Sequence, residues 1–292
     1  MFKGSIVAIV TPFDKENKVD EGGLEKLVEF QIAGGTDGIV PCGTTGESAT
    51  LDYKEHERVI EICVRAAKKR VPVIAGTGSN STQEAIEMSL EAKKIGADGL
   101  LLVSPYYNKP TQKGLYLHFK AIADRVDLPI VLYNIASRTG INIEPETIAR
   151  LSEDCKNIVA VKEASGSLDQ MSRVMALCGK KMTMLSGDDS LTLPQMAIGG
   201  EGVISVVANI IPKDVKAMVV AFNKGELVEA RRLHYKMLSL IKVMFIETNP
   251  IPVKTALGLM GLCQPFLRLP MCEMMPENSS KLAAALKDYK LI

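Results

Sequence analysis

Three features of the 292-residue sequence predict an α/β fold in which eight parallel strands close into a barrel. Short apolar runs rich in β-branched residues alternate with longer amphipathic stretches. Each of the eight runs is followed by a stretch of helical period. The runs are apolar throughout, which is typical of parallel strands covered on both faces. Eight such units over about 225 residues fit a (β/α)8 TIM barrel better than an open, doubly wound sheet.

Strands and helices alternate in a regular order from the first run onward. The predicted strands are SIVAIV (5–10), GIVPC (38–42), VPVIAG (71–76), GLLLVS (99–104), LPIVLYN (128–134), NIVAVK (157–162), MTMLSG (182–187) and GVISVV (202–207). Helical patterns follow near residues 22–34, 53–69, 82–95, 112–125, 145–153, 168–178, 189–198 and 213–223. Thr82, Thr111 and Asp189 are residue types that cap helices, so we expect helices to start there.

The last part of the chain has a different pattern. From about residue 225 it is helical throughout, with no strand signal. The helical stretches cover 226–247, 251–261 and 278–289. We therefore expect a catalytic (β/α)8 barrel over 1–224 and a C-terminal helical domain over 225–292.

Charge and composition exclude several classes of function. The chain has 35 basic and 34 acidic residues, a formal net charge of +1, so it has no electrostatic footprint for nucleic acid or an anionic membrane. Hydrophobic residues make up 47% and charged residues 24%, as in a globular protein. The first apolar run is interrupted at Thr11 and Pro12, too early for a signal peptide or a membrane span. We expect a cytoplasmic protein.

Cysteines and histidines give no sign of a metal site. The six cysteines are scattered without a C-x-x-C pair, and the three histidines lack metal-binding spacing. We expect reduced thiols, no catalytic metal and no cofactor.

Polar segments follow the second to seventh runs, where the active site of such a barrel is built. They are GTTGES (43–48), GTGSNS (76–81), PYYNKP (105–110), YNIASRTG (133–140), KEASG (162–166) and SGDDS (186–190). We expect these loops to converge on one mouth.

Lys162 ends an apolar strand, where a charged amine is costly. Desolvation there favours the neutral amine, which is a Schiff-base nucleophile toward a carbonyl. Tyr133 ends the preceding strand, and its phenol could move protons for a carbinolamine. We expect Glu163 to face outward or to be structural.

Two features predict anion sites. In GTTGE the amides of Thr45 and Gly46 are expected at the start of the next helix, a favourable place for the carboxylate of an α-keto acid. Arg138 lies four residues beyond the strand-ending Asn134 and could bind a second carboxylate with both arms of its guanidinium.

Other enzyme classes fit less well. GTGSNS follows a strand as a dinucleotide fingerprint would, but Ser81 replaces its third glycine and no acidic residue ends the next strand. A nicotinamide oxidoreductase is therefore disfavoured. A non-catalytic regulatory barrel stays open, since fold alone does not fix function.

With these residues assembled, the chain resembles the dihydrodipicolinate synthase family of the pyruvate-dependent class I aldolase superfamily. The resemblance runs from GSIVAIVTPF through ETNPIPVK (247–254) to RLP (268–270). Its specific motifs are GIVPCGTTGES with Glu55 downstream, and YN-x-x-SRTG followed by VKEASG. It implies a lyase of lysine and diaminopimelate biosynthesis that joins pyruvate to L-aspartate 4-semialdehyde.

The resemblance implies a role for each matching residue. Lys162 would form the Schiff base, and Tyr133 would shuttle protons with Thr44 and Tyr107. Thr45 would bind the pyruvate carboxylate and Arg138 that of the semialdehyde, with Gly187 and Ile204 lining the pocket. In the family the residue matching Tyr107 crosses from a neighbouring subunit, which implies at least a dimer and usually a tetramer, a dimer of dimers.

The sequence departs from the family pattern at Ala136 and at Tyr53. Ala136 stands where the family has Pro, which frees a dihedral angle in the Arg138 loop. Arg138 favours the synthase over the related N-acetylneuraminate lyase, which has an apolar residue at that position. Another pyruvate-dependent aldolase, such as 2-keto-3-deoxygluconate aldolase, stays an alternative. Residues that match an allosteric lysine site are also present, with Tyr53 in place of His: Ser48, Ala49, His56, Asn80, Glu84 and Tyr106.

Overall fold

The computed structural model describes residues 2–292 and contains one eight-stranded parallel sheet. The strand order is β2-β1-β8-β7-β6-β5-β4-β3, and a parallel bridge between Ile39 and Val73 joins the two ends. The predicted (β/α)8 TIM barrel is therefore confirmed. The strands are β1 (Gly4–Ala8), β2 (Gly38–Val40), β3 (Ile74–Gly76), β4 (Gly99–Val103), β5 (Ile130–Asn134), β6 (Ile158–Glu163), β7 (Thr183–Ser186) and β8 (Gly202–Ser205).

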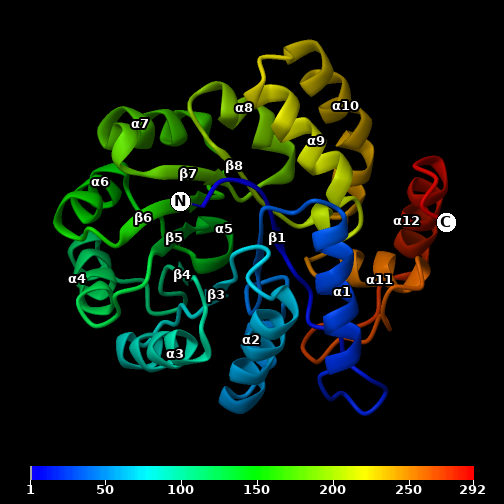
Figure 1. The fold of residues 1–292 in the computed structure, drawn as a ribbon, viewed down its shortest axis with the longest axis horizontal. Helices are drawn as coiled ribbons and strands as arrows, with labels where there is room; N and C mark the ends of the chain where they lie inside the picture. The colour runs from blue at the N-terminus through cyan, green and yellow to red at the C-terminus, as the bar shows by residue number, and fades with distance from the viewer. Residues whose placement is uncertain (1) are drawn as a thin grey trace.

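Helices surround the strands, as Figure 1 shows. Thr111 caps its helix as predicted. Helical turns also begin at Thr82 and Asp189 as predicted, but the capping side chains are those of the preceding residues, Ser81 and Asp188, which accept hydrogen bonds from main-chain amides. The main barrel helices are α1 (Glu21–Ala33), α2 (Tyr53–Ala67), α3 (Thr82–Ile95), α4 (Gln112–Ala123), α6 (Pro145–Asp154), α7 (Leu168–Cys178), α8 (Thr192–Ala197) and α9 (Pro212–Asn223).

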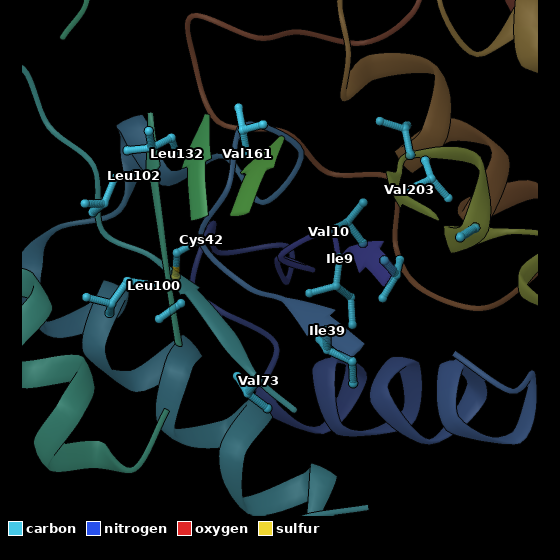
Figure 2. Close-up of a cluster of buried hydrophobic side chains, with 14 of the residues drawn as sticks. Ile9, Val10, Ile39, Cys42, Val73, Leu100, Leu102, Leu132, Val161 and Val203 are labelled. Carbon is cyan, nitrogen blue, oxygen red and sulfur yellow. The ribbon is translucent and has the colours of Figure 1, made fainter. Parts of the chain in front are cut away.

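Each strand buries both faces, one in each of two apolar clusters. The outer cluster fills the space between strands and helices, and Figure 2 shows part of it, including Ile39, Leu100 and Val203. The inner cluster fills the barrel lumen and includes Leu101 and Ile204. Burial on both faces explains why the strand sequences are apolar at successive positions.

Three further helices follow the barrel: α10 (Leu227–Val243), α11 (Ile251–Leu259) and α12 (Pro276–Asp288). Helix α10 packs against α9 and α12, and α12 packs against α11. In Figure 1 they form the gold to red part of the molecule. The domain boundary at residue 224 stays a prediction. Within residues 2–292, no helix combines the length and apolar character needed to cross a membrane.

Candidate active site

Lys162 and Tyr133 are neighbours across β5 and β6. They are partners in the parallel register, and the Lys162 Nζ atom lies over the Tyr133 ring, 4.1 Å from its centroid. Both side chains are buried, with 5% and 4% exposed. Tyr133 belongs to the apolar cluster of the lumen, so the predicted nucleophile and proton shuttle meet inside the barrel.

A bulge in β6 is what directs Lys162 inward. Ile130 pairs with Ile158 and the next residue, Val131, pairs with Ala160, so β6 contains one extra residue. Val159 and Ala160 both lie in the lumen cluster, whereas strict alternation would place only one of them there. Without the extra residue, the side chain at position 162 would point toward the helices.

Lys162 has close neighbours but no carboxylate partner within residues 2–292. A Cβ atom on Gly187 would lie 3.1 Å from its Cε atom and 2.6 Å from the Cβ of Ala164. Glycine at 187 therefore leaves room for the lysine side chain. Ile204, fully buried in β8, belongs to the same lumen cluster as Tyr133.

Glu163 points the other way and is structural. It is fully buried and accepts hydrogen bonds from Asn134 Nδ2 at 3.0 Å, the Ser165 amide at 2.7 Å and Gln170 Nε2 at 3.2 Å. These bonds join the ends of β5 and β6 on the outer face of the barrel. They hold the backbone next to both Tyr133 and Lys162.

The expectation that Thr45 and Gly46 begin a helix is wrong. The Gly46 amide donates to the Gly43 carbonyl at 3.1 Å, which closes a turn. Helix α2 begins only at Tyr53, where Asp52 and Glu55 form a capping box. The intervening loop prevents the α2 dipole from acting at Thr45.

A residue of the C-terminal helical segment contacts both predicted anion sites. Asn249 Nδ2 donates to the buried Thr45 Oγ1 at 3.0 Å. The main-chain carbonyl of Asn249 accepts a bond from Arg138 Nη2 at 3.1 Å. The sequence contained Asn249 within the ETNPIPVK motif but gave no chemical reason to select it.

Arg138 lies in the short helix α5 (Ala136–Thr139), which the periodicity did not predict. Ala136 is its first residue, and the Gly140 amide donates to the Ala136 carbonyl at 2.9 Å. One helical turn therefore orders this loop without the proline of the family motif. Proline is also compatible with that position, where a helix needs no amide donor.

A cavity of about 600 Å³ opens between these loops and the C-terminal segment. Thr44, Ile135, Arg138 and Asn249 line one part of it. Five of the six residues matching a lysine site line the same cavity: Ser48, Ala49, His56, Glu84 and Tyr106. The sixth, Asn80, donates from Nδ2 to the Tyr106 carbonyl at 3.2 Å.

The part of this cavity around Glu84 and His56 carries one negative charge. Hydrogen bonds from Ser79 and Tyr53 lower the pKa of Glu84 and keep its carboxylate ionised. Burial lowers the pKa of His56, so its imidazole is neutral at pH 7. An anionic side chain beside the tyrosine rings 53 and 106 suits a cationic amino group.

Tyr107 is not part of the site formed by a single chain. Its side chain is 90% exposed, and its φ of 71° lies in the left-handed region. Such a conformation is uncommon and costs free energy in a residue other than glycine.

A buried ion pair anchors the GTTGE loop to the C-terminal segment. Lys254 Nζ lies 2.6 Å from Glu47 Oε1, with 0% and 2% of the two side chains exposed. The Arg268 amide donates to the other Glu47 oxygen at 3.2 Å. Sequence reasoning missed this cluster, although Lys254 stands in an apolar segment as Lys162 does.

Within the described 291 residues, no group of acidic, histidine or cysteine side chains could hold a metal ion.

Comparison with known proteins agrees with this geometry. The model of the dihydrodipicolinate synthetase family matches residues 1–289. A 4-hydroxy-tetrahydrodipicolinate synthase of Geotalea daltonii is 64% identical over 292 residues, with both chains covered completely. The crystal structure of dihydrodipicolinate synthase from Aquifex aeolicus has a TM-score of 0.98 and 52% identity, covering 99% of each chain. A lysine-bound structure of the enzyme from Cyanidioschyzon merolae has a TM-score of 0.97 and 43% identity, covering 100% of this chain and 99% of that one. The chain belongs to the dihydrodipicolinate synthetase family.

Proposed function

We propose that this protein is a 4-hydroxy-tetrahydrodipicolinate synthase, a lyase of lysine and diaminopimelate biosynthesis that condenses pyruvate with L-aspartate 4-semialdehyde. The family membership and the names of full-length relatives support the overall reaction. The observation that carries the mechanism is the unpaired, buried Lys162 amine 4.1 Å from the centroid of the Tyr133 ring.

The proposed reaction starts with attack of the Lys162 amine on the keto carbon of pyruvate. The carbinolamine loses water to give an imine, with Tyr133 supplying and removing protons. Loss of a proton from the methyl carbon gives an enamine, which attacks the aldehyde carbon of the semialdehyde. The amino group of the new chain then attacks the imine carbon, closes the ring and releases Lys162.

The two carboxylates have separate binding groups in this proposal. The Thr45 hydroxyl and its amide, which has no acceptor in the part of the chain described, would receive the pyruvate carboxylate. The Arg138 guanidinium, which forms no ion pair within residues 2–292, would bind the semialdehyde carboxylate. Gly187 and Ile204 would line the pocket around the adduct.

A steady-state assay tests the proposed reaction. Purified protein supplied with pyruvate and L-aspartate 4-semialdehyde should form the cyclic product. N-acetylneuraminate and 2-keto-3-deoxygluconate should be cleaved far more slowly. The aldehyde part of each carries no carboxylate for Arg138 to bind. A higher kcat/KM for either sugar acid would overturn the proposal.

We also propose that Tyr107 completes the proton relay, with Thr44, of a neighbouring subunit. Its exposure and left-handed backbone support this, as does the resemblance to a family of dimers of dimers. Lys162→Met and Tyr107→Phe proteins, each inactive alone, should regain activity when their subunits are mixed and reassembled. A fully active monomer, shown by analytical ultracentrifugation at assay concentration, would contradict this proposal. It would also contradict the proposed tetramer.

We further propose that lysine inhibits this enzyme at the Glu84 end of the cavity. Glu84 and Tyr106 provide a charge and a ring for an amino-acid cation, but Tyr53 occupies one Glu84 oxygen. We expect inhibition at millimolar lysine and stronger inhibition of Tyr53→His, which restores the residue of the lysine-sensitive type. Flat inhibition curves for both proteins would dismiss the site.

A cytoplasmic location is proposed from the six free cysteines. Burial raises the pKa of Cys63 and Cys178, which favours inert thiols suited to a reducing compartment. Recovery of the protein in a secreted or periplasmic fraction would contradict this.

A further inference from the structure

Asn249 stands between the two groups assigned to the two substrate carboxylates. It lies two residues before the start of α11 and is 5% exposed. Its side chain contacts Thr45 and its main-chain carbonyl contacts Arg138. The mechanism does not use it. Its place in the C-terminal segment makes that segment part of the active site.

The bond to Thr45 has a direction with chemical consequences. A threonine hydroxyl has one O–H donor and two acceptor lone pairs. Asn249 Nδ2 donates to Thr45 Oγ1, so one lone pair is used and the hydroxyl hydrogen is left for another acceptor. Within residues 2–292 the Thr45 hydroxyl forms no other hydrogen bond. A buried hydroxyl held in this way can donate to the pyruvate carboxylate.

The bond to Arg138 depends on a different part of Asn249. The guanidinium is a planar fork with five N–H donors and a flexible stem, so one fixed N–H bond restricts where the others point. The acceptor is the Asn249 main-chain oxygen, which survives any change of side chain. The two substrate sites can therefore be separated by substitution.

The position of Asn249 is itself held firmly. The Lys254 amide donates to the Pro250 carbonyl at 3.0 Å, and the Lys254 side chain forms the buried pair with Glu47. Glu47 lies two residues beyond Thr45. The loop that carries Thr45 and the turn that carries Asn249 are thus tied together at a second point.

We propose that Asn249 is a positioning residue that keeps the Thr45 hydroxyl directed as a donor to the pyruvate carboxylate, while its main-chain oxygen orients Arg138. This inference rests on the proposed function. The Oδ1 atom of Asn249 is buried with no hydrogen-bond partner in the described chain, so the side chain contacts Thr45 through its N–H group alone.

Asn249→Asp tests the proposal with almost no change in shape. An ionised Asp accepts the Thr45 hydroxyl instead of donating to it, and places a negative charge beside the carboxylate site. We expect the KM for pyruvate to rise about ten- to a hundredfold, since a bond to a charged group is lost. The KM for the semialdehyde should change by less than about twofold, because the main-chain oxygen is unaltered.

Two companion variants complete the test. Asn223→Asp makes the same chemical change on the exposed end of α9 and should leave both KM values unchanged. Asn249→Ala should raise the pyruvate KM in the wild-type background but not in Thr45→Val, where the acceptor is already absent. If Asn249→Asp does not fold, as judged by circular dichroism, the Asn249→Ala pair decides the question.

The outcomes separate this inference from the proposed function. An inactive wild-type protein would refute the function itself. An active wild type with folded Asn249 variants whose pyruvate KM is unchanged, or rises equally with the semialdehyde KM, would overturn only the positioning role. Additive effects of Asn249→Ala and Thr45→Val would overturn it as well.

Discussion

Two buried lysines of this molecule each lie over an aromatic ring, but only one of them is paired with a carboxylate. Lys162 Nζ lies 4.1 Å from the centroid of the Tyr133 ring, and Lys254 Nζ lies 4.1 Å from that of Phe13. Lys254 is joined to Glu47 at 2.6 Å, whereas Lys162 has no carboxylate partner within residues 2–292. The ring alone therefore does not distinguish a structural lysine from a reactive one. The presence of a carboxylate does.

The difference follows from the cost of burying charge. A buried ion pair can balance its desolvation when the geometry is close, as it is for Lys254. Burial lowers the pKa of the Lys254 ammonium, and the Glu47 carboxylate opposes that shift. An unpaired buried amine has no such compensation and is retained only where its chemistry is needed.

The largest expected effect is that of Lys162→Met. Methionine fills similar space without an amine, so the Schiff base cannot form and kcat should fall by about 10⁴-fold or more. The free energy of unfolding should stay the same or rise, because an unpaired buried polar group is removed. Stopped assays and urea titrations measure the two quantities. If Lys162→Met kept its turnover, Lys162 would be a structural lysine like Lys254, and the account would be wrong.

Tyr133→Phe sharpens the comparison by keeping the ring and deleting the phenol. The ring contact with Lys162 remains, so folding should change little. Proton transfer loses its carrier, and kcat should fall about 10²- to 10⁴-fold. An active Phe variant would show that the ring, and not the hydroxyl, is what the site requires.

Lys254→Met should affect stability where Lys162→Met affects turnover. It leaves Glu47 buried without its partner, which should cost about 3–5 kcal/mol of unfolding free energy. Denaturant titration followed by circular dichroism measures this loss.

The second substitution Glu47→Gln should restore most of that stability, since an amide needs no counter-charge yet still accepts the Arg268 amide bond. A double variant as unstable as the single one would contradict the ion-pair explanation.

Phe13→Leu should have the smallest effect. Phe13 is fully buried, and the centroid of its ring also lies 4.3 Å from the Arg268 guanidinium carbon. Loss of the ring removes cation–π attraction and some packing, about 1–3 kcal/mol together, and should leave kcat within about twofold. A large loss of activity with normal stability would indicate that Phe13 acts on the active site.

Much of the fold could be predicted because strand period and burial are local properties of the sequence. All eight strands overlap their predicted runs, and α3 and α7 match their predicted ranges. The inward direction of Lys162 is expected from its chemistry, but the strand period does not explain it. It depends on the extra residue in β6, and a bulge is decided by pairing with β5, which the apolar run Ile158–Val161 does not encode.

The remaining errors have the same origin in long-range contacts. The GTTGE sequence predicts a helix start, but the loop forms a turn. Glu47 in this loop pairs with Lys254, which lies 207 residues away along the chain. Asn249 is equally remote from Thr45, 204 residues along the chain. A charged residue within an apolar segment was the signal used for Lys162. The same signal at Lys254 would have identified the second buried lysine, though not its partner.

Borohydride trapping with pyruvate tests the central claim most directly. Protein incubated with pyruvate, reduced and digested should show by mass spectrometry a reduced pyruvate adduct on the peptide containing Lys162, with loss of activity in proportion. Lys254 should remain unmodified under the same conditions. An adduct on Lys254, or none on Lys162, would contradict the account.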